Sequence, residues 1–435
     1  MPLIWEAFFF TFTFMKFNLA IIYIYIILSF LLIIYIPLGS YDSIGPQWFS
    51  ISLLNFIFLI VINKKSFFKY VKSLLDILFI RLYILFIIIT IISFFFASNI
   101  SIFFHDLGRI LSSFLFLLSF SFCLNSIGIK RSFHLISIAV CSLLFYEIFR
   151  SLKPYIIYFY SNGFDFWKDL KYAPSDFRGI AGNKNLTAVL FMLKLPFLFF
   201  LMHQNSLYKK IISSILFLFS ISILLILEAR ATYISFILMA IIYAAYLIFF
   251  NRKSISNIFF LAIPLLLSLV FINYLQDSIE NASSISSNLS SIQLNNTSSS
   301  NRFELWSNVI THLKDHPFGI GLGNWKLEAS QYWGQMGSAY QVPYHAHNDF
   351  LEISIETGIY NGVIYFSLFC IVLYYSFINI KKSSTIYFLV VFSGITIYLV
   401  DAMLNFPLER AYVQLLLHVY FSIYLVLFLN NHSHE

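Results

Sequence analysis

Long apolar segments alternate with short polar segments along most of the chain. Runs of about 20 apolar residues are long enough to cross the hydrocarbon core of a bilayer as α-helices. The pattern therefore predicts an all-α polytopic membrane protein with about 12 transmembrane helices. We place these spans at about 18–37, 48–62, 77–97, 107–125, 133–149, 186–203, 211–227, 232–250, 255–275, 349–378, 385–404 and 411–429.

Basic residues give the predicted spans an orientation. Lysines and arginines gather in every second connection between the spans, and short connections rich in these residues stay on the cytoplasmic side of a membrane. Twelve spans put all of these clusters on that side, together with both termini. The clusters contain Lys16, Lys64, Lys65, Lys69, Lys72, Lys130, Arg131, Lys209, Lys210, Arg252, Lys253, Lys381 and Lys382.

Two long loops emerge on the opposite, non-cytoplasmic side. The first lies near 150–185, and the second, 276–348, separates spans one to nine (1–275) from spans ten to twelve (349–435). The second loop begins with a Ser/Asn-rich run that has few residues able to form a core. An amphipathic helix is predicted next, at 302–317, and a glycine-rich turn after it.

Composition supports the membrane assignment. Hydrophobic residues make up 60% of the chain and charged residues 11%, against roughly 25% charged residues in soluble domains. The formal net charge of +7 does not indicate nucleic-acid binding, because the lysines are scattered in pairs between apolar runs. The three cysteines all fall within apolar runs, so we expect neither a disulfide nor a cysteine-based metal site. The first apolar run has no cleavage signature, so we expect a retained span.

Ionisable residues gather at the predicted non-cytoplasmic ends of the spans. Arginine binds phosphate oxygens with a planar, permanently charged fork, and a neutral histidine accepts a proton near neutral pH. The pattern therefore predicts a site for an anionic ligand at this face. Its segments are "SDFRGIAGNKNLTA" (175–188), "LEARATY" (227–233), "SNRFELW" (300–306), "HAHNDFLEISIETG" (345–358) and "DAMLNFPLERAY" (401–412).

The segment 345–358 carries the densest set of polar groups. His345 and His347 have a spacing that permits a metal site, but no HExxH motif accompanies them, so we expect no metal. In a helix, Asn348, Glu352 and Glu356 share one face, which we expect to point into the bundle because lipid would penalise it.

Structural roles compete with a binding role at several of these positions. Arg230 and Arg410 also suit an interfacial anchor, and Arg302 has Glu304 and Asp315 nearby in sequence. Two further basic residues enter the predicted spans: Arg109, near the non-cytoplasmic end of span four, and Lys194, beside a proline in span six. A lysine within a span is costly and needs a carboxylate partner, which the sequence does not identify.

"YHAHNDFLEISIETG", preceded by "NRFELW" and "HPFGIGLGNW", resembles the O-antigen ligase and polymerase superfamily. The resemblance extends from the Arg-Gly…Gly-Asn-Lys-Asn segment to Arg410. It implies that His347 is the catalytic base and that Arg230 and Arg302 hold a lipid diphosphate. It assigns Arg178 and Lys184 to donor binding more weakly. His345 also carries over more weakly. From the residues themselves, we expect His345, Asn348, Glu356 and Arg410 to support the site. The family pattern slips by one residue at Asn361.

The resemblance implies a metal-independent glycosyltransferase without a cofactor, in the bacterial inner membrane. Its partners would be a glycan on undecaprenyl diphosphate and an acceptor hydroxyl at the periplasmic face. O-antigen ligation to lipid A–core is the first hypothesis. A polysaccharide polymerase and a protein O-oligosaccharyltransferase are the alternatives within the superfamily. A transporter of lipid-linked glycan is the alternative from another class, although transporters usually bind near the membrane midplane.

Overall fold

The computed structural model describes residues 19–34, 44–162, 183–227, 229–277, 302–331, 344–383 and 385–432, without the side chains of 154–162 and 274–277. These parts are helical, with no strand. The helices are α2 Ile44–Val61, α3 Lys64–Leu74, α4 Leu78–Ile92, α5 Ile100–Ile127, α6 Ile129–Asn162, α8 Lys184–Met192, α9 Leu195–Met202, α10 Leu207–Leu227, α11 Arg230–Ala245, α12 Phe259–Asp277, α14 Arg302–Asp315, α15 Trp325–Glu328, α16 Asp349–Thr357, α17 Ile359–Ser383, α18 Ile386–Leu404 and α19 Ala411–His432.

Eleven stretches of helix among the described residues are long and apolar enough to cross a membrane, and Leu19–Ile33 forms a shorter apolar helix. The predicted class, an all-α polytopic membrane protein, is confirmed. Many large apolar side chains, such as Phe95 and Tyr374, are exposed on the outside of the bundle. That outer surface suits lipid, because lipid tails are as apolar as these side chains.

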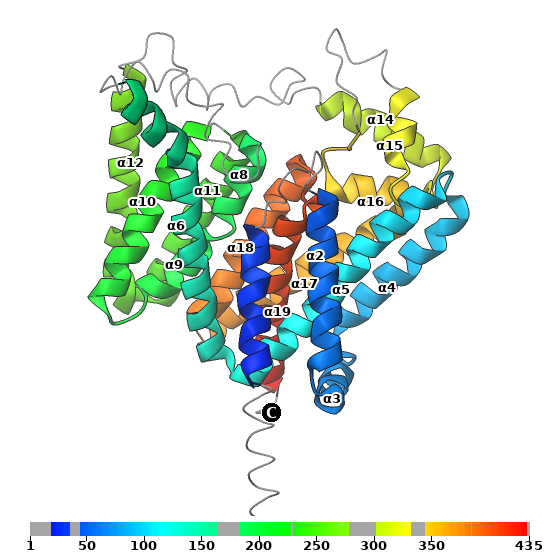
Figure 1. Cartoon of the computed structure of the whole chain (residues 1–435), viewed down its shortest axis with the longest axis horizontal. Coiled ribbons are helices and arrows are strands. Elements are labelled where there is room, and N and C mark those ends of the chain that lie inside the picture. Colours follow the sequence, from blue (N-terminus) through cyan, green and yellow to red (C-terminus); the bar gives the residue numbers. More distant parts are fainter. Residues whose placement is uncertain are drawn as a thin grey trace, which may run out of the picture.

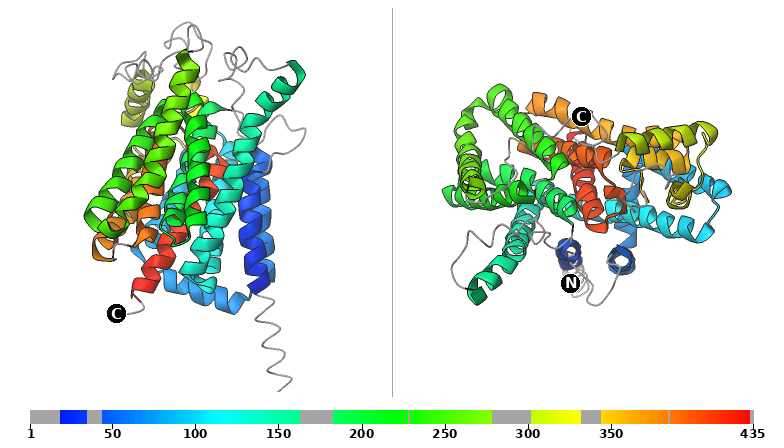
Figure 2. Two further views of the ribbon diagram at one scale, coloured as in Figure 1. Left: turned by 90° about the vertical axis from the view of Figure 1, so that its left-hand side faces the viewer. Right: turned by 90° about the horizontal axis from the view of Figure 1, so that it is seen from above.

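The bundle has two groups of helices with α18 and α19 between them (Figure 1). Helices α6 and α8 to α12 form one group, and α2 to α5 with α16 and α17 form the other. Seen from above, α18 and α19 lie near the centre of the molecule (Figure 2). Helix α19 packs along α5, and α18 packs against α9, α11 and α17. This central pair joins the two groups, and most residues of α19 are buried.

The amphipathic helix expected at 302–317 is present as α14, whose Leu305 and Val309 are buried. Together with α15 and α16 it covers one end of the second group (Figure 1). The glycine-rich turn after α14 packs against the end of α16. Here the backbone N–H groups of Ile320 and Gly321 donate to the carbonyls of Ile355 and Glu356. This packing satisfies carbonyls that a helix end leaves without intrahelical partners.

The span expected at 349–378 is two helices instead of one, because Gly358 separates α16 from α17. Gly358 has a φ of 98°, a conformation that glycine adopts without steric cost. The Ile359 N–H donates to the Pro317 carbonyl at 3.2 Å, so the turn 317–323 holds the break in place. Span six, expected at 186–203, is likewise divided into α8 and α9 next to Lys194.

Replacing Gly358 with alanine is expected to lower the free energy of unfolding by about 1–3 kcal/mol, the cost of a strained backbone conformation. A Cβ there would also lie 3.1 Å from the Phe318 backbone. Gly108→Ala is the matched control, because Gly108 lies within helix α5 and no atom lies within 4 Å of an added Cβ. Thermal unfolding in detergent measures both variants. Equal melting temperatures for Gly358→Ala and the wild type would contradict the predicted strain.

Candidate active site

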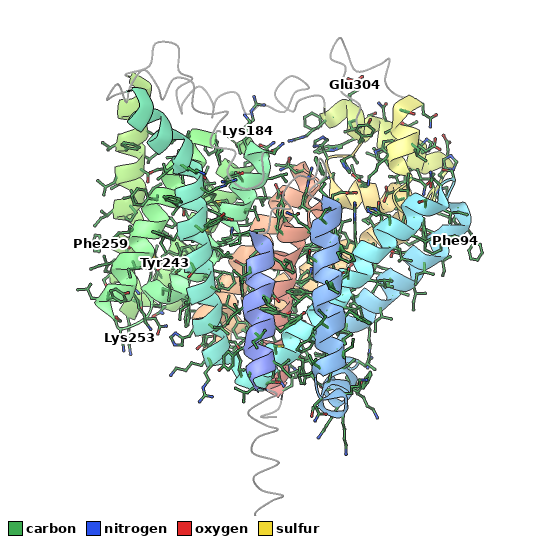
Figure 3. The ribbon with its side chains drawn as sticks, in the orientation of Figure 1. Phe94, Lys184, Tyr243, Lys253, Phe259 and Glu304 are labelled. Carbon is green, nitrogen blue, oxygen red and sulfur yellow. The ribbon has the colours of Figure 1, made fainter. Side chains whose placement is uncertain are left out.

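Four helices begin at the same end of the bundle and bring their positive ends there. Helix α8 begins at Lys184, α11 at Arg230, α14 at Arg302 and α16 at Asp349. Lys184 and Glu304 mark this end in Figure 3, and Lys253 marks the opposite end. Helix N-termini carry partial positive charge and free N–H groups, so they favour anions. Three of these four helices also place a basic side chain at their first residue.

A cavity of about 260 Å³ opens at this end of the bundle. Its walls come from three segments far apart in the sequence: the start of α8, the segment 344–347 before α16, and the turn after α18. The tertiary fold brings these segments together, since no local sequence pattern joins them. The lining residues are Asn183, Asn185, Leu186, Tyr344, His345, His347, Asn405 and Phe406.

Arg302 reaches the cavity wall from the first turn of α14. Its Nη2 donates to Asn405 Oδ1 at 3.2 Å, and Asn405 Nδ2 donates to Asp401 at 2.5 Å. Burial and the positive charge of Arg230 both lower the pKa of Arg302, while Asp401 opposes them. The charges of Arg230 and Arg302 therefore act on each other at this end of the bundle. Among the described residues, Arg302 contacts Asn405 instead of Glu304 or Asp315, the alternative partners that its sequence neighbourhood offers.

The aromatic ring of Phe406 packs against three of the predicted site residues. The His345 ring stacks on it, with centroids 4.3 Å apart and planes 11° apart, and the His347 ring meets it edge-on at 5.0 Å. The Arg410 guanidinium carbon lies 5.1 Å from the same ring centroid, a cation–π arrangement. Arg410 thus packs beside the site, and Phe406 fixes the two histidines in place.

His347 has a positive φ of 51°, unusual for a residue other than glycine. Burial, the charge of Arg302 and the charge of His345 lower the pKa of His347 to about 4. Its Nδ1 is buried and has no hydrogen-bond partner among the described residues. The His347 ring is therefore neutral at pH 7.

His345 forms a hydrogen-bonded pair with Glu352, one turn into α16. The His345 Nδ1 lies 2.8 Å from Glu352 Oε1, and the Ala346 N–H donates to Glu352 Oε2 at 2.9 Å. On the other side of the segment, the Trp306 Nε1 donates to the Ala346 carbonyl at 3.0 Å. Asn348 caps α16 through the N–H groups of the next turn. The segment 344–348 is therefore anchored to both α14 and α16.

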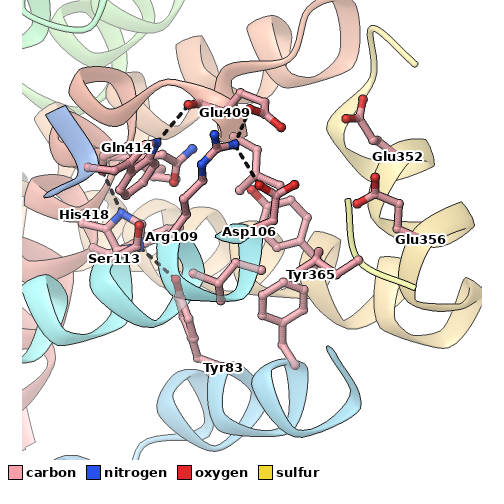
Figure 4. Close-up of a pocket in the computed structure, with 17 residues that line it drawn as sticks. Tyr83, Asp106, Arg109, Ser113, Glu352, Glu356, Tyr365, Glu409, Gln414 and His418 are labelled. Atoms are coloured by element: carbon pink, nitrogen blue, oxygen red, sulfur yellow. Dashed lines mark hydrogen bonds and ion pairs between the residues drawn. The ribbon is translucent and has the colours of Figure 1, made fainter. Parts of the chain in front are cut away.

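A smaller cavity of about 40 Å³ is lined in part by Glu352, the partner of His345 (Figure 4). Arg109 binds Asp106 at 3.0 Å and also the Glu409 carboxylate. Lys326 binds Glu409 at 2.5 Å and Asp106 at 3.3 Å. Burial opposes the charge on Lys326, but these two carboxylates outweigh it and raise the pKa of Lys326. Glu356, buried as expected, also lines this cavity. Through its ion pairs with Asp106 and Glu409, Arg109 therefore supports the site structurally.

His345, Glu352 and Glu409 each place one possible metal-ligand atom within 4.8 Å of the others. Lys326 and Arg109 already bind the Glu409 carboxylate. A divalent cation would meet both positive charges there, so the cluster suits an ion-pair network better than a metal site. The expectation of a metal-independent site remains a prediction.

The structure places His345 and His347 on the cavity wall and Arg302 against Asn405 of that wall, and Arg230 acts electrostatically on Arg302. Lys184 lies at the start of α8 beside the cavity without lining it, and Arg178 lies outside the described residues. Sequence reasoning missed three participants. Phe406 and Asn405 lie within the polar segment 401–412, where only the charged residues drew notice. Lys326 follows the glycine turn. Nothing in the sequence marks it as a site residue, because its carboxylate partners are known only from the structure.

Together, these features define a multi-pass membrane protein with a histidine-lined cavity at one end of the bundle. The family model described as O-antigen ligase matches residues 215–366, the region that contains Arg230, Arg302, His345 and His347. The resemblance to the O-antigen ligase superfamily is thereby confirmed. No curated protein matches the chain significantly.

Proposed function

We propose that this protein transfers a glycan from undecaprenyl diphosphate to an acceptor hydroxyl at the periplasmic face of the bacterial inner membrane. The observation that carries the proposal is a cavity lined by two histidines, with Arg302 bound to Asn405 of its wall and Arg230 acting electrostatically on Arg302. Lipid A–core is the proposed acceptor, which makes the reaction O-antigen ligation. A repeat-unit polymerase and a protein O-oligosaccharyltransferase differ from it in the acceptor.

The proposed chemistry is a single displacement. The acceptor oxygen attacks the anomeric carbon, and the bond from that carbon to the diphosphate breaks. Arg230 and Arg302 stabilise the charge that grows on the diphosphate, a preorganised electrostatic effect. A histidine on the cavity wall removes the proton from the acceptor hydroxyl, a role that the family resemblance gives to His347. The proposed transfer needs neither a metal ion nor a cofactor, so a chelator should leave it unchanged.

The distribution of charge supports the proposed orientation. Helix α3, with four exposed lysines, lies at the end of the molecule opposite to the cavity (Figure 1). Lys253 marks that same end in Figure 3. Lysine-rich short connections favour the cytoplasm, so the cavity would face the periplasm and both termini would be cytoplasmic.

Deletion of the gene in its native host tests the proposal. If the protein is a ligase, deletion of its gene should leave long glycan chains on the lipid carrier. Expression of the wild-type protein should restore their transfer. The His347→Ala variant should not restore it, because the variant lacks a histidine of the cavity wall. Single repeats on the carrier would identify a polymerase instead, and loss of protein glycosylation with normal lipopolysaccharide would identify a protein transferase. Normal surface glycan with His347→Ala would refute the role of this residue.

A further inference from the structure

We infer that His345, oriented by Glu352, is the proton acceptor of the transfer reaction, and that His347 contributes to donor binding. This inference rests on the proposed glycosyl transfer and changes the residue that performs one step in it. Both histidines line the same cavity, so position alone does not choose between them. The hydrogen bonds around each ring distinguish the two histidines.

The hydrogen bond to Glu352 decides which nitrogen of His345 is free. A carboxylate only accepts hydrogen bonds, so the His345 Nδ1 at 2.8 Å from Glu352 Oε1 carries the proton. The other nitrogen, Nε2, then holds the lone pair. The second carboxylate oxygen is occupied by the Ala346 N–H at 2.9 Å, which keeps Glu352 turned toward the ring. A base oriented in this way by a third group recurs in many enzymes with activated hydroxyl nucleophiles.

The same carboxylate stabilises the product of proton transfer. When Nε2 of His345 accepts a proton, the ring becomes a cation held directly against Glu352. The ring is already fixed by its stacking on Phe406, with planes 11° apart, and 17% of the side chain is exposed at the cavity. Little reorganisation is needed when the charge appears, and this lowers the barrier to the step.

His347 has the opposite surroundings. No carboxylate of the described residues forms a hydrogen bond or ion pair with it, and the positive charge of Arg302 acts on its ring. A proton placed on His347 would therefore be repelled by the arginine that is proposed to hold the diphosphate. Burial and Arg302 lower the pKa of His347 to about 4. A neutral ring beside Arg302 is better suited to contact the donor than to hold the acceptor's proton.

The step balances as follows. The O–H bond of the acceptor breaks, and its proton forms an N–H bond at Nε2 of His345. The acceptor oxygen forms the new bond to the anomeric carbon, and the electron pair of the bond from that carbon to the donor oxygen leaves with the undecaprenyl diphosphate. Release of the proton from His345 to water restores the neutral ring. Glu352 keeps its charge throughout and acts as a positioning residue.

Steady-state kinetics of the purified, full-length protein tests the assignment, with lipid-diphosphate-linked glycan as donor. His345→Ala is expected to lower kcat by about 10²–10⁴-fold, the usual contribution of general base catalysis, with little change in the donor KM. Added imidazole should restore part of the kcat, since the missing ring leaves space at the cavity. His347→Ala should instead raise the donor KM, far enough to prevent transfer at the donor level of the cell, and imidazole should not restore its activity.

Glu352 is tested by a graded pair of variants. Glu352→Gln removes the negative charge and should lower kcat without changing the donor KM, whereas Glu352→Asp should recover part of the loss. Glu304→Gln is the matched control, because Glu304 lies on the same side of the molecule and forms no ion pair with a described residue. A fall in folded protein at unchanged kcat would show that Glu352 is only structural and would overturn its assignment.

The outcomes separate this inference from the proposed function. Wild-type protein without transfer from any lipid-diphosphate donor would refute the proposed function itself. Wild-type transfer together with full kcat in His345→Ala would refute only the inference, and so would imidazole rescue of His347→Ala alone. His432→Ala, at the opposite end of the bundle in α19, controls for the loss of a histidine.

Discussion

Replacing Arg302 with alanine is expected to lower kcat by about 10²–10³-fold, the usual cost of removing one donor that stabilises developing negative charge. Arg302 is the first residue of α14 and binds Asn405 of the cavity wall, and the charge of Arg230 lowers its pKa. Loss of Arg302 would leave the leaving diphosphate with one arginine fewer. Transfer from a lipid-diphosphate-linked donor by the purified variant measures the effect.

Arg302→Lys separates charge from geometry. Lysine keeps the positive charge but lacks the planar fork that binds two oxygens at once, so an intermediate kcat is expected. Lys314→Ala is the control, since this exposed lysine lies near the other end of the same helix. Helix α14 should remain in place in both Arg302 variants, because Trp306 still bonds to the Ala346 carbonyl. Wild-type kcat in Arg302→Ala would refute the proposed role.

Replacing Lys194 with methionine is expected to destabilise the bundle by about 3–5 kcal/mol, the cost of leaving one partner of a buried ion pair unpaired. The Lys194 Nζ lies 2.6 Å from both carboxylate oxygens of Glu147, and neither side chain is more than 4% exposed. Methionine fills a similar volume, so the loss reports the stranded charge. The melting temperature in detergent and the yield of monodisperse protein measure it.

A double variant distinguishes the ion pair from packing. Glu147→Leu with Lys194→Met removes both charges, and apolar replacement of a whole buried pair is often neutral. Its melting temperature should therefore approach that of the wild type. Lys253→Met, at the exposed end of the bundle opposite to Lys184 and Glu304 (Figure 3), should change little. A double variant as unstable as the sum of the two single variants would show that the residues are not coupled.

The helix break beside Lys194 shows why its partner escaped sequence analysis. Glu147 lies on α6, 47 residues earlier in the chain, and no periodicity connects the two. The break itself is stabilised by a still more distant residue, since Tyr420 donates to the Leu193 carbonyl at 2.6 Å. Pro196 signalled an interruption, because proline disrupts helix hydrogen bonding. Only the packing of α19 shows what supports it.

Within the segment 345–358, local patterning was informative for the helix but not for its break. The i, i+4 spacing predicted that Glu352 and Glu356 share a buried face, and both line the small cavity. The pattern also suggested one continuous span through Gly358. The turn 317–323 interrupts it there, because its backbone N–H groups bind the carbonyls at the end of α16. That contact joins residues more than 30 positions apart.

The sequence by itself determined the class of the protein, and it predicted the face at which polar groups gather and the basic and histidine residues there. Hydrophobic length and helical periodicity are local properties, so they can be found without knowing the fold. The tertiary structure alone decided the pairing of Glu147 with Lys194, the packing of Phe406 against the two histidines and the start of four helices at one end of the bundle. Such contacts depend on which helices pack together, and shape complementarity across the whole bundle determines that packing.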